Sequence, residues 1–459
     1  MNRYVISVGG TGQHIALALT RLVRAGALEG LKLIALDPDN ETRLPQLLRA
    51  PTPSLSGAKH PLQDGVVKAP FDIARLGQKT FEQLFVDPDH PKEQELFQCL
   101  FDSDEASIAI HKGMYGTPCV GATVFAEGAN GELIQNLLRP LASATQVFVC
   151  GSVVGGTGAG IIHKLVAEIR RYYHHEIYGI FMLPWFDVSA AAGKGAITPA
   201  TISRNASHGV KYFYEHTIPG LTASLLIGYP GTQQSAVLRK LTLGEGNMGE
   251  NPHYLHLAAA RAIVDLPAAH TANRGVKAYG MIHDLRNEGW LLDTAWESGH
   301  SLRKLFRGLR VQHNLLSFLV LPENRKKIID YYGSFLMGSS DAFESLDGSI
   351  KLNVTERKLR KPFAERVLDR FAEIQQEVEF CVSWAQQIFP VELIDVADDS
   401  LMNELQGAFM RRAESSVHWK RLQLMWKGRE LPANPDKPNT GADVAEHHAK
   451  ALLEQALSS

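Results

Sequence analysis

The chain has 459 residues, which is enough for two or three domains on length alone. Hydrophobic residues make up 45% of it and charged residues 21%, which is the profile of a soluble globular protein. The 47 Lys and Arg residues nearly balance the 49 Asp and Glu residues, so charge gives no reason to expect nucleic acid or an anionic membrane as the main partner. No apolar run approaches the ~20 residues that span a bilayer, and the first residues do not resemble a secretory signal.

The cysteines do not form a C-x-x-C pair, and their spacing is irregular. This pattern favours reduced thiols over a disulfide framework or a zinc site, so we expect a cytoplasmic protein. The four residues are Cys99, Cys119, Cys150 and Cys381.

Strands and helices alternate over residues 1–285, which predicts an α/β fold with a mainly parallel sheet and helices on both faces. A long, largely apolar helix over about 252–267 is expected to lie in the middle of the protein. The expected strands are 4–8, 31–37, 106–110, 145–152, 177–186 and 223–231; the expected helices are 12–26, 121–138, 161–171, 203–217 and 252–267, with loops and short helices over 40–105.

The pattern changes from about Trp290, where we expect a divergent, mainly helical domain over 286–428. A Pro/Asn-rich linker and a short amphipathic tail helix follow over 429–459. One helix of the middle region is expected to bury a stripe of residues at three- and four-residue steps. The stripe consists of Phe363, Val367, Phe371, Ile374, Val378, Cys381, Ala385 and Ile388.

Two strand–glycine–helix junctions stand out, "VISVGGTGQHIALALTRLV" at 5–23 and "GSVVGGTGAG" at 151–160. Glycines after a strand let the backbone approach a ligand, and the start of the following helix offers unpaired N–H groups with a partial positive charge. Each junction therefore predicts a phosphate site. A turn that serves only tight strand–helix packing is the structural alternative for either junction.

Two common phosphate-binding loops fit these junctions poorly. Gly10-x-Gly12, with Asp37 at the end of the second strand, resembles a dinucleotide-binding loop, but Ile15 stands where its third glycine belongs. That interpretation also leaves the second junction unexplained. A Walker loop needs Gly-Lys followed by Ser or Thr, and the sequence contains no such triplet.

The second junction resembles the signature GGGTG[S/A]G of the tubulin/FtsZ superfamily, with Val154 in place of the first glycine. The resemblance covers roughly residues 1–275, follows the family's order of motifs, and is greatest to the divergent bacterial tubulin-like proteins. It implies that the second junction wraps the phosphates of GTP and that the first junction completes the pocket. The residues so implied are Gly155, Gly156, Thr157, Gly158, Ala159 and Gly160 in the second junction and Gly9, Gly10, Thr11 and Gly12 in the first.

The resemblance extends to three further motifs of the first 130 residues. Gln13 and His14 stand where the family places polar residues, the second of which touches the base. Asp39, in "LIALDPDNE", matches the acid that follows the second strand. Gly113 and Gly116, in "GMYGTPCVGATVFA", resemble the turn near the terminal phosphate. His14 is also explained by a helix start that has no ligand.

Three later residues match positions that contact nucleotide in the family. Arg204 and Asn205 open a helix where the family contacts ribose and phosphate, although a role at the surface explains them as well. Asn251, at the start of the apolar helix, is the candidate for stacking on the base, and a helix cap is its alternative role.

The function implied by the resemblance is binding of GTP or GDP with Mg²⁺, with head-to-tail assembly of identical subunits. No residue is assigned to the metal, and the tail after Arg429 is a candidate contact for a protein partner. Two alternatives remain open: a non-polymerising nucleotide-dependent scaffold or sensor in a bacterial multi-protein system, and an NAD(P)-linked oxidoreductase that uses only the first junction.

Hydrolysis is where the sequence departs from the family. The family places an Asn and one or two acids in the loop after the core helix, where they orient the attacking water in the neighbour's pocket. Here residues 268–275 contain no carboxylate. The candidates are Asp265, on the helix itself, and Asp284, in "HDLRNEG", which resembles tubulin's Asp-Leu-Arg but comes later. We therefore expect GTP hydrolysis to be slow or to need a partner.

Overall fold

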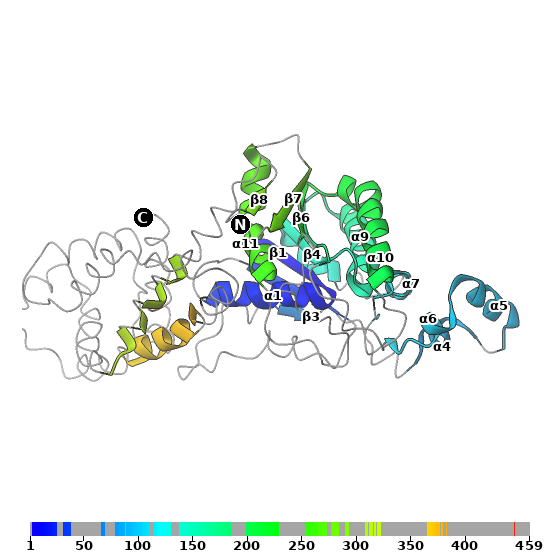
Figure 1. Ribbon diagram of the computed structural model, residues 1–459, viewed down its shortest axis with the longest axis horizontal. Helices are drawn as coiled ribbons and strands as arrows, with labels where there is room; N and C mark the ends of the chain where they lie inside the picture. The colour runs from blue at the N-terminus through cyan, green and yellow to red at the C-terminus, as the bar shows by residue number, and fades with distance from the viewer. Residues whose placement is uncertain are drawn as a thin grey trace, which may run out of the picture. The chain divides into compact units, whose positions relative to one another are not determined.

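The structure is a computed structural model whose described residues fall into two compact units (Figure 1). The first unit comprises Met1–Thr20, Gly30–Ala50 and Asp64–Ser301, and the second comprises Arg21–Glu29, Pro51–Gln63 and Leu302–Ser459. The residues that the structure describes are 2–24, 31–37, 66–68, 79–87, 89–110, 114, 116–129, 137–184, 199–228, 254–272, 277–283 and 290–292, with shorter stretches within 308–322 and 365–382 and residue 445.

An eight-stranded sheet forms the centre of the first unit, in the order β3-β2-β1-β4-β5-β6-β7-β8. The strands are β1 (Arg3–Val8), β2 (Leu31–Leu36), β3 (Val66–Lys68), β4 (Gln146–Ser152), β5 (Glu176–Met182), β6 (Ala223–Gly228), β7 (Ala278–His283) and β8 (Trp290–Leu292). Every neighbouring pair is parallel except β7 and β8. The predicted α/β fold with a mainly parallel sheet is therefore confirmed.

Helices cover both faces of this sheet (Figure 1). They are α1 (Gly9–Arg24), α4 (Phe81–Phe85), α5 (Pro91–Leu100), α6 (Ser103–Ala106), α7 (Pro118–Ala129), α9 (Gly156–Tyr172), α10 (Pro199–Tyr212) and α11 (Tyr254–Ala272), with short 3-10 or π segments at Arg139–Ser143, Phe213–Thr217 and Ile218–Gly220. α9 packs against β1 and β4 and is covered by α7, whereas α11 packs against β5 and β6. None of the described helices is both long and apolar enough to cross a membrane.

The side chains of β1, β2, β4, β5 and β6 are almost all buried, on both faces of the sheet, which explains the continuous apolar runs of these strands. In β1, Ile6 and Val8 belong to the hydrophobic cluster that includes α7 and α9. Val5, which precedes Ile6, is also completely buried but lies outside that cluster. Because successive side chains of a strand point to opposite faces, Val5 helps to form the core on the other face.

Two elements differ from the sequence-based expectation. The run 106–110 makes only an isolated bridge, from Ala109 to Thr80, because its isoleucines are buried beside short helices instead of in the sheet. The core helix continues through Pro267 to Ala272. A proline removes one helical hydrogen bond, yet Leu266 and the apolar face before it are buried and hold the helix in place.

A small aromatic core organises residues 79–107. The ring of Phe81 lies 4.8 Å from that of Phe101 and 5.2 Å from that of Phe97, in edge-on or tilted arrangements that aromatic rings favour. Capping boxes begin α4 and α6: Thr80 pairs with Gln83, and Asp102 pairs with Glu105. Each box satisfies backbone N–H groups that a short helix otherwise leaves open.

In the second unit, residues 365–376 are helical, as predicted. Val367, Phe371, Ile374 and Val378 of the expected stripe are buried. On the same helix, Gln375 Nε2 lies 3.3 Å from Ser317 Oγ and 3.2 Å from Glu379 Oε2.

Helices α7 and α9 approach each other through glycines. A Cβ atom built on Gly160 would lie 2.5 Å from the carbonyl oxygen of Pro118 and 2.7 Å from the nitrogen of Ala122. A Cβ atom on Gly121 would overlap the carbonyl oxygen of Gly156. The two backbones can therefore touch only because these positions have no side chain.

We expect Gly160→Ala to lower the free energy of unfolding by about 1–3 kcal/mol, because the added methyl group forces α7 and α9 apart. The helix propensity of alanine acts in the opposite direction, so a loss reports the contact. Urea unfolding measures the effect. Gly155→Ala is the control, since its Cβ atom would meet nothing closer than Ser152 Cβ at 3.8 Å. Equal stability of the two variants would contradict the packing described here.

Candidate functional site

The candidate site lies at the edge of the sheet where the strand order reverses. Strands β2 and β3 extend the sheet on one side of β1, and β4, β5 and β6 extend it on the other. Ligands of doubly wound sheets bind outside the carboxyl ends of the strands at such a point. Both glycine junctions are there: α1 begins directly after β1, and α9 begins after the turn that follows β4.

The two junctions touch each other. Gly9 has a φ of +67°, in the left-handed region that favours glycine. A Cβ atom at Gly9 would lie 3.0 Å from Cβ of Thr157 and 3.2 Å from the nitrogen of Gly158. A Cβ atom at Gly158 would in turn lie 2.6 Å from the carbonyl oxygen of Ser152. The first turns of α1 and α9 are thus in backbone contact.

The glycines predicted as loops are the first turns of helices, since α1 begins at Gly9 and α9 at Gly156. The true turn is the segment 153–155. Ser152 holds it, because its Oγ accepts hydrogen bonds from the backbone nitrogens of Val154 (3.1 Å) and Gly155 (3.3 Å). Sequence reasoning missed Ser152, although a serine at a strand end before glycines is a known signal for a turn.

A third segment meets the start of α9. A Cβ atom at Gly156 would lie 2.6 Å from the carbonyl oxygen of Met114 and 2.8 Å from the nitrogen of Thr117. Gly116 has a φ of +75°, and its carbonyl oxygen accepts a hydrogen bond of 3.2 Å from Asn205 Nδ2. The structure thus brings the predicted Gly116 and Asn205 together, and the amide of Asn205 positions this segment.

The site collects the positive ends of three helices. The first turns of α1, α7 and α9 contain no acidic residue. The N-cap of α9 is Gly155, so no side chain caps its first N–H groups. Gly10, Thr11, Gly155 and Thr117 are only half-buried, so water reaches this region. Uncapped N–H groups and partial positive charges are the features that bind anions.

Gln13 is the unusual polar residue of the site. Its side chain is completely buried, and neither Nε2 nor Oε1 has a hydrogen-bond partner within the described part of the chain. A buried amide without partners costs stability, so its presence needs an explanation. The neighbouring His14 is also buried, and its ring stacks on that of His256 in α11, with centroids 5.0 Å apart.

The remaining predicted residues are dispersed. Arg204 lies exposed on α10. Asp265 forms an ion pair with Arg261 one turn earlier on α11, with Oδ2 3.2 Å from Nε. Four predicted site residues lie outside the described residues: Asp39, Gly113, Asn251 and Asp284.

Sequence reasoning also missed the role of Gly209 in α10. A Cβ atom there would overlap the carbonyl oxygen of Val153, so glycine lets α10 reach the turn before α9. A lone glycine inside a helical pattern is the signal that could have indicated this approach. As for metals, the described residues contain no group of three or more His, Cys, Asp or Glu side chains placed to hold an ion.

Cys119, in the first turn of α7, is exposed, and a neighbouring carboxylate holds its thiol in the protonated form. Its Sγ donates a hydrogen bond of 3.0 Å to Glu105 Oε1. Burial and the charge and hydrogen bond of Glu105 raise the pKa of Cys119 to about 12, so the thiol stays protonated at neutral pH. Cys99, Cys119 and Cys150 are free thiols, and Cys381 lies outside the described residues.

Comparison with known proteins finds similarity at the level of structure. No family model and no curated protein matches the chain. Solved structures of tubulin/FtsZ superfamily members are similar to part of it. The GTPγS-bound protofilament of CetZ2 from Haloferax volcanii is 19% identical, with a TM-score of 0.33 over 59% of this chain and 59% of that chain. CetZ from Methanosaeta thermophila is 15% identical, with a TM-score of 0.35 over 59% and 54%.

A more distant similarity is to the protofilament of TubZ from bacteriophage PhiKZ, which is 12% identical, with a TM-score of 0.31 over 61% of this chain and 67% of that chain. The chain spans less than two thirds of the CetZ2 and CetZ structures.

We expect Glu105→Gln to speed the alkylation of Cys119 by iodoacetamide at pH 8. The substitution removes the negative charge that raises the thiol pKa, so the thiolate fraction grows by about tenfold for each unit by which the pKa falls. Glutamine can still accept the capping hydrogen bond from Asp102. Mass spectrometry of the peptide that contains Cys119 gives the rate, and exposed Cys99 in the same sample is the control. An unchanged rate at Cys119 would contradict the contact with Glu105.

Proposed function

We propose that the chain is a tubulin/FtsZ-like guanine-nucleotide-binding protein that associates with itself, with GTP hydrolysis that is slow or needs a partner. The observation that carries the proposal is the backbone contact between the first turns of α1 and α9 at the point where the strand order reverses. The contact at Gly9 supports a single pocket built from both glycine junctions.

A polyphosphate fits the chemistry of this site. Three helix starts without acidic residues offer N–H donors to negatively charged oxygens. The glycines leave the backbone of the junctions accessible to a ligand, because no side chain shields the N–H groups. The amide of Gln13 can donate to a phosphate oxygen or to a bound water, which would satisfy a group that otherwise has no partner.

The choice of a guanine nucleotide follows from the resemblance of residues 155–160 and of the other motifs, in their order, to the tubulin/FtsZ family. On this proposal His14 and Asn251 contact the base, and Gly116 lies near the terminal phosphate. Mg²⁺ would be held mainly by phosphate oxygens and water, which is its usual preference. Among the described residues, the helix starts of the site contribute no carboxylate to it.

An NAD(P)-linked oxidoreductase is a weaker candidate. Such a protein needs only the junction after β1, and the contact of Gly9 with Thr157 and Gly158 would then have no purpose. Ile15, at the position of the third glycine, is completely buried in the core. A non-polymerising scaffold or sensor would use the same pocket, so only the assembly state separates it from our proposal.

Hydrolysis has weak support from the described residues. Asp265 is paired with Arg261 and is only 18% exposed, so its carboxylate is already neutralised within α11. A group that orients water for attack on a phosphate must be available to that water. Asp284 therefore remains the better candidate for a catalytic acid supplied to a neighbouring subunit.

We expect Gln13→Leu to separate ligand binding from folding. Without nucleotide, the free energy of unfolding should stay the same or rise, because an unpaired buried amide is replaced by an apolar group of similar size. The affinity for GTP should fall by about tenfold or more, the effect of losing one or two hydrogen bonds. Isothermal titration and urea unfolding measure the two quantities.

Gln98→Leu, an exposed position on α5, is the matched control for that substitution. A Gln13→Leu variant that is less stable but binds nucleotide like the parent would show that Gln13 is structural and would contradict our proposal. Chromatography of nucleotide extracted from the purified protein identifies the ligand directly, and NAD(P) would favour the oxidoreductase.

We expect a slowly hydrolysed GTP analogue to drive assembly more strongly than GDP, as seen by sedimentation over a range of protein concentrations. Phosphate release under assembling conditions should be slow and unaffected by Asp265→Ala. Fast release that Asp284→Ala abolishes would place the catalytic acid at residue 284 and overturn the expectation of slow hydrolysis. A monomer under all nucleotides would favour the scaffold.

A further inference from the structure

Two surfaces of the first unit carry five of the six large hydrophobic side chains that the described residues expose. One surface is on α5, where Leu96 is 62% exposed and Leu100 is 65% exposed. The other involves α9 and α10, where Tyr172, Tyr212 and Tyr214 are 54%, 41% and 52% exposed. Exposed apolar side chains that gather in this way mark interaction sites more often than those scattered singly.

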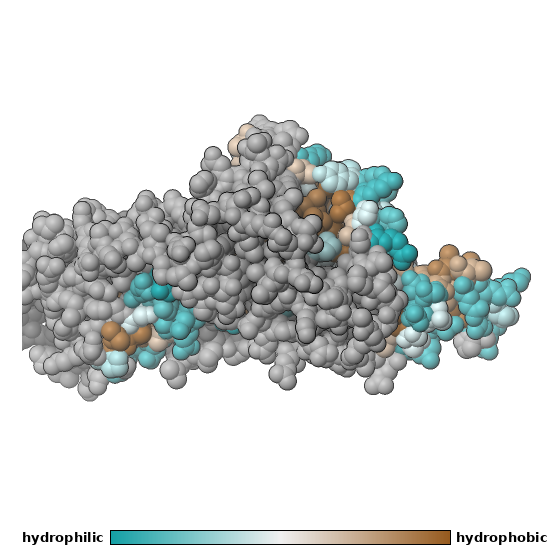
Figure 2. Space-filling model, in the orientation of Figure 1, coloured by the Kyte–Doolittle hydropathy of each residue, from teal (hydrophilic) through white to brown (hydrophobic). Residues whose placement is uncertain are grey.

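Leu96 and Leu100 of α5 are not covered by any part of the chain that the structure describes. Phe97, the residue after Leu96, is turned inward: it is 6% exposed and belongs to the aromatic core of residues 79–107. Leu96 and Leu100 are one turn apart, so they lie on the same outward side. Figure 2 shows hydrophobic residues at the surface over this segment, bordered by hydrophilic ones.

Strong negative charge surrounds these leucines. Residues 79–107, here called the acidic segment, contain eight acidic side chains and two lysines, a formal charge of −6. Since the whole chain has a charge of −2, the remaining residues carry +4. The acidic segment is therefore set apart electrostatically from the rest of the protein.

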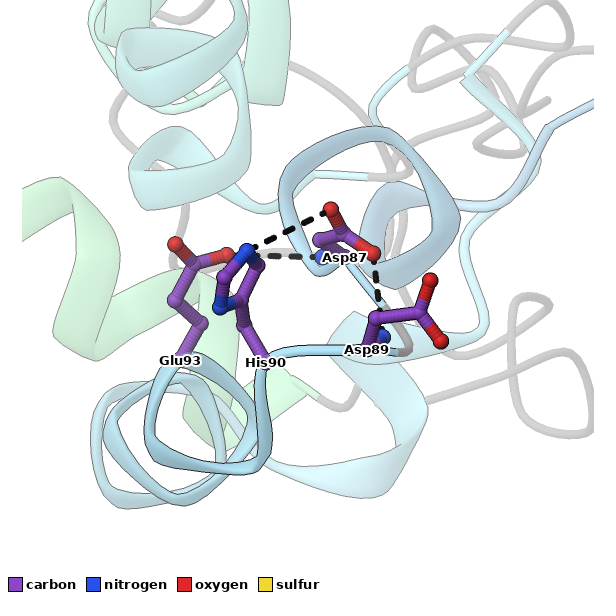
Figure 3. Close-up of polar contacts among 4 residues, drawn as sticks. All are labelled: Asp87, Asp89, His90 and Glu93. Atoms are coloured by element: carbon purple, nitrogen blue, oxygen red, sulfur yellow. Dashed lines mark hydrogen bonds and ion pairs between the residues drawn. The ribbon is translucent and has the colours of Figure 1, made fainter.

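The carboxylates at the start of α5 also fix its position (Figure 3). Asp87 Oδ1 accepts a hydrogen bond of 3.0 Å from the backbone nitrogen of Asp89, and Oδ2 lies 3.8 Å from Nε2 of His90. Glu93 Oε2 accepts a bond of 3.4 Å from the backbone nitrogen of Asp87. These contacts fix the turn before α5 and therefore the orientation of the helix that carries Leu96 and Leu100.

The second surface, here called the α9–α10 surface, consists of Lys164, Arg171, Tyr172, Lys211, Tyr212 and Tyr214. The two helices meet where the ring of Tyr212 lies edge-on to that of His163, with centroids 5.0 Å apart. The side chains of Arg171 and Lys211 are 71% and 72% exposed.

On α9, the basic side chains are more exposed than the acidic side chain with which they pair. Glu168, which is paired with both Lys164 (3.2 Å) and Arg171 (3.8 Å), is only 11% exposed, whereas the side chains of its two partners are 42% and 71% exposed. A π segment, Phe213–Thr217, carries Tyr214 at the end of α10. Segments of π-helix are rare and frequent at functional sites.

We propose that the acidic segment of one copy docks on the α9–α10 surface of a second copy of this chain. Leu96 and Leu100 pack on the exposed tyrosines, and the surrounding carboxylates face the lysine and arginine side chains. The acidic segment is strongly negative, whereas the α9–α10 surface presents Lys164, Arg171 and Lys211 beside two acids, Glu168 and Glu215, and so is weakly positive. Both surfaces are partly apolar, and opposite charge with apolar contact is the complementarity that specifies a partner. The proposal rests on the self-association part of the proposed function and names one contact between copies, which lies apart from the nucleotide pocket.

This contact joins two different surfaces, so it is heterologous. Two copies joined through one such contact leave one acidic segment and one α9–α10 surface unused, so further copies can add. Nucleotide is not part of the contact, so the contact can be tested with and without it.

Two variants test the proposal, each of which breaks one surface through exposed residues. Leu96→Ser with Leu100→Ser removes the apolar face of the acidic segment, and Arg171→Glu with Lys211→Glu reverses the charge of the α9–α10 surface. Each variant alone should associate about tenfold to hundredfold more weakly than the parent in analytical ultracentrifugation, because two anchoring side chains are lost. Leu321→Ser, at an exposed leucine of the second unit, is the control and should behave like the parent.

A mixture of the two variants gives the decisive result. The intact acidic segment of one variant can still dock on the intact α9–α10 surface of the other, so the mixture should form dimers and nothing larger. Raising the salt concentration should weaken the dimer, since screening reduces the attraction between the charged groups. A mixture that stays monomeric, a parent that stays monomeric, or double variants that associate like the parent would each overturn the proposal.

Guanine nucleotide binding is measured in every variant, so that failure of the contact and failure of the nucleotide site are distinguished. Dimers in the mixture with no nucleotide binding by the parent would support the contact and refute the pocket. Normal nucleotide binding with no dimer would do the reverse.

Discussion

The close approach of α1 and α9 is the constraint on which the rest of the first unit depends. The parallel pairing of β1 and β4 places the ends of these strands side by side, and each strand leads into a helix at that edge. The helix starts can meet only because Gly9 has no side chain and adopts a positive φ, and because Gly158 presents bare backbone to it. A larger residue at Gly9 would adopt an unfavourable positive φ, and its Cβ atom would also crowd Thr157 and Gly158.

This arrangement has an electrostatic cost, which the Glu105 carboxylate beside Cys119 offsets only at the start of α7. Three helix starts with partial positive charges lie close together, and their first turns contain no carboxylate. Like charges in a confined region repel, and the buried amide of Gln13 adds an unsatisfied polar group. A bound anion relieves both costs, so a site of this kind is less stable empty than filled.

The sequence predicts the parallel sheet and the two glycine junctions because both depend on local patterns. Apolar runs followed by glycines are visible residue by residue, and the ion pair of Arg261 with Asp265 is also readable from their spacing of one turn. The contacts of Gly121 and Gly160 between α7 and α9 depend on tertiary packing, which no local pattern contains. The burial of Gln13 also depends on tertiary packing. The sequence does not show that its side-chain amide is buried without a hydrogen-bond partner among the described residues.

Other elements escaped prediction because local signals were in competition. Residues 79–107 are rich in turn formers and charge, which hid the aromatic core of Phe81, Phe97 and Phe101. Pro267 is a strong signal for the end of a helix, yet α11 continues beyond it. Burial of an apolar face outweighs one missing hydrogen bond there, which is a balance that sequence alone does not resolve.

The hydrogen bond from Asn205 to the carbonyl oxygen of Gly116 has a consequence for control. It joins the segment before α7 directly to α10, the helix that also carries Lys211 and Tyr212. A shift of Gly116 toward a phosphate would thus pull on the helix that presents these residues. Binding at two coupled sites is thermodynamically reciprocal. If a ligand in the pocket strengthens a contact made through α10, that contact must raise the affinity of the pocket for the ligand by the same factor.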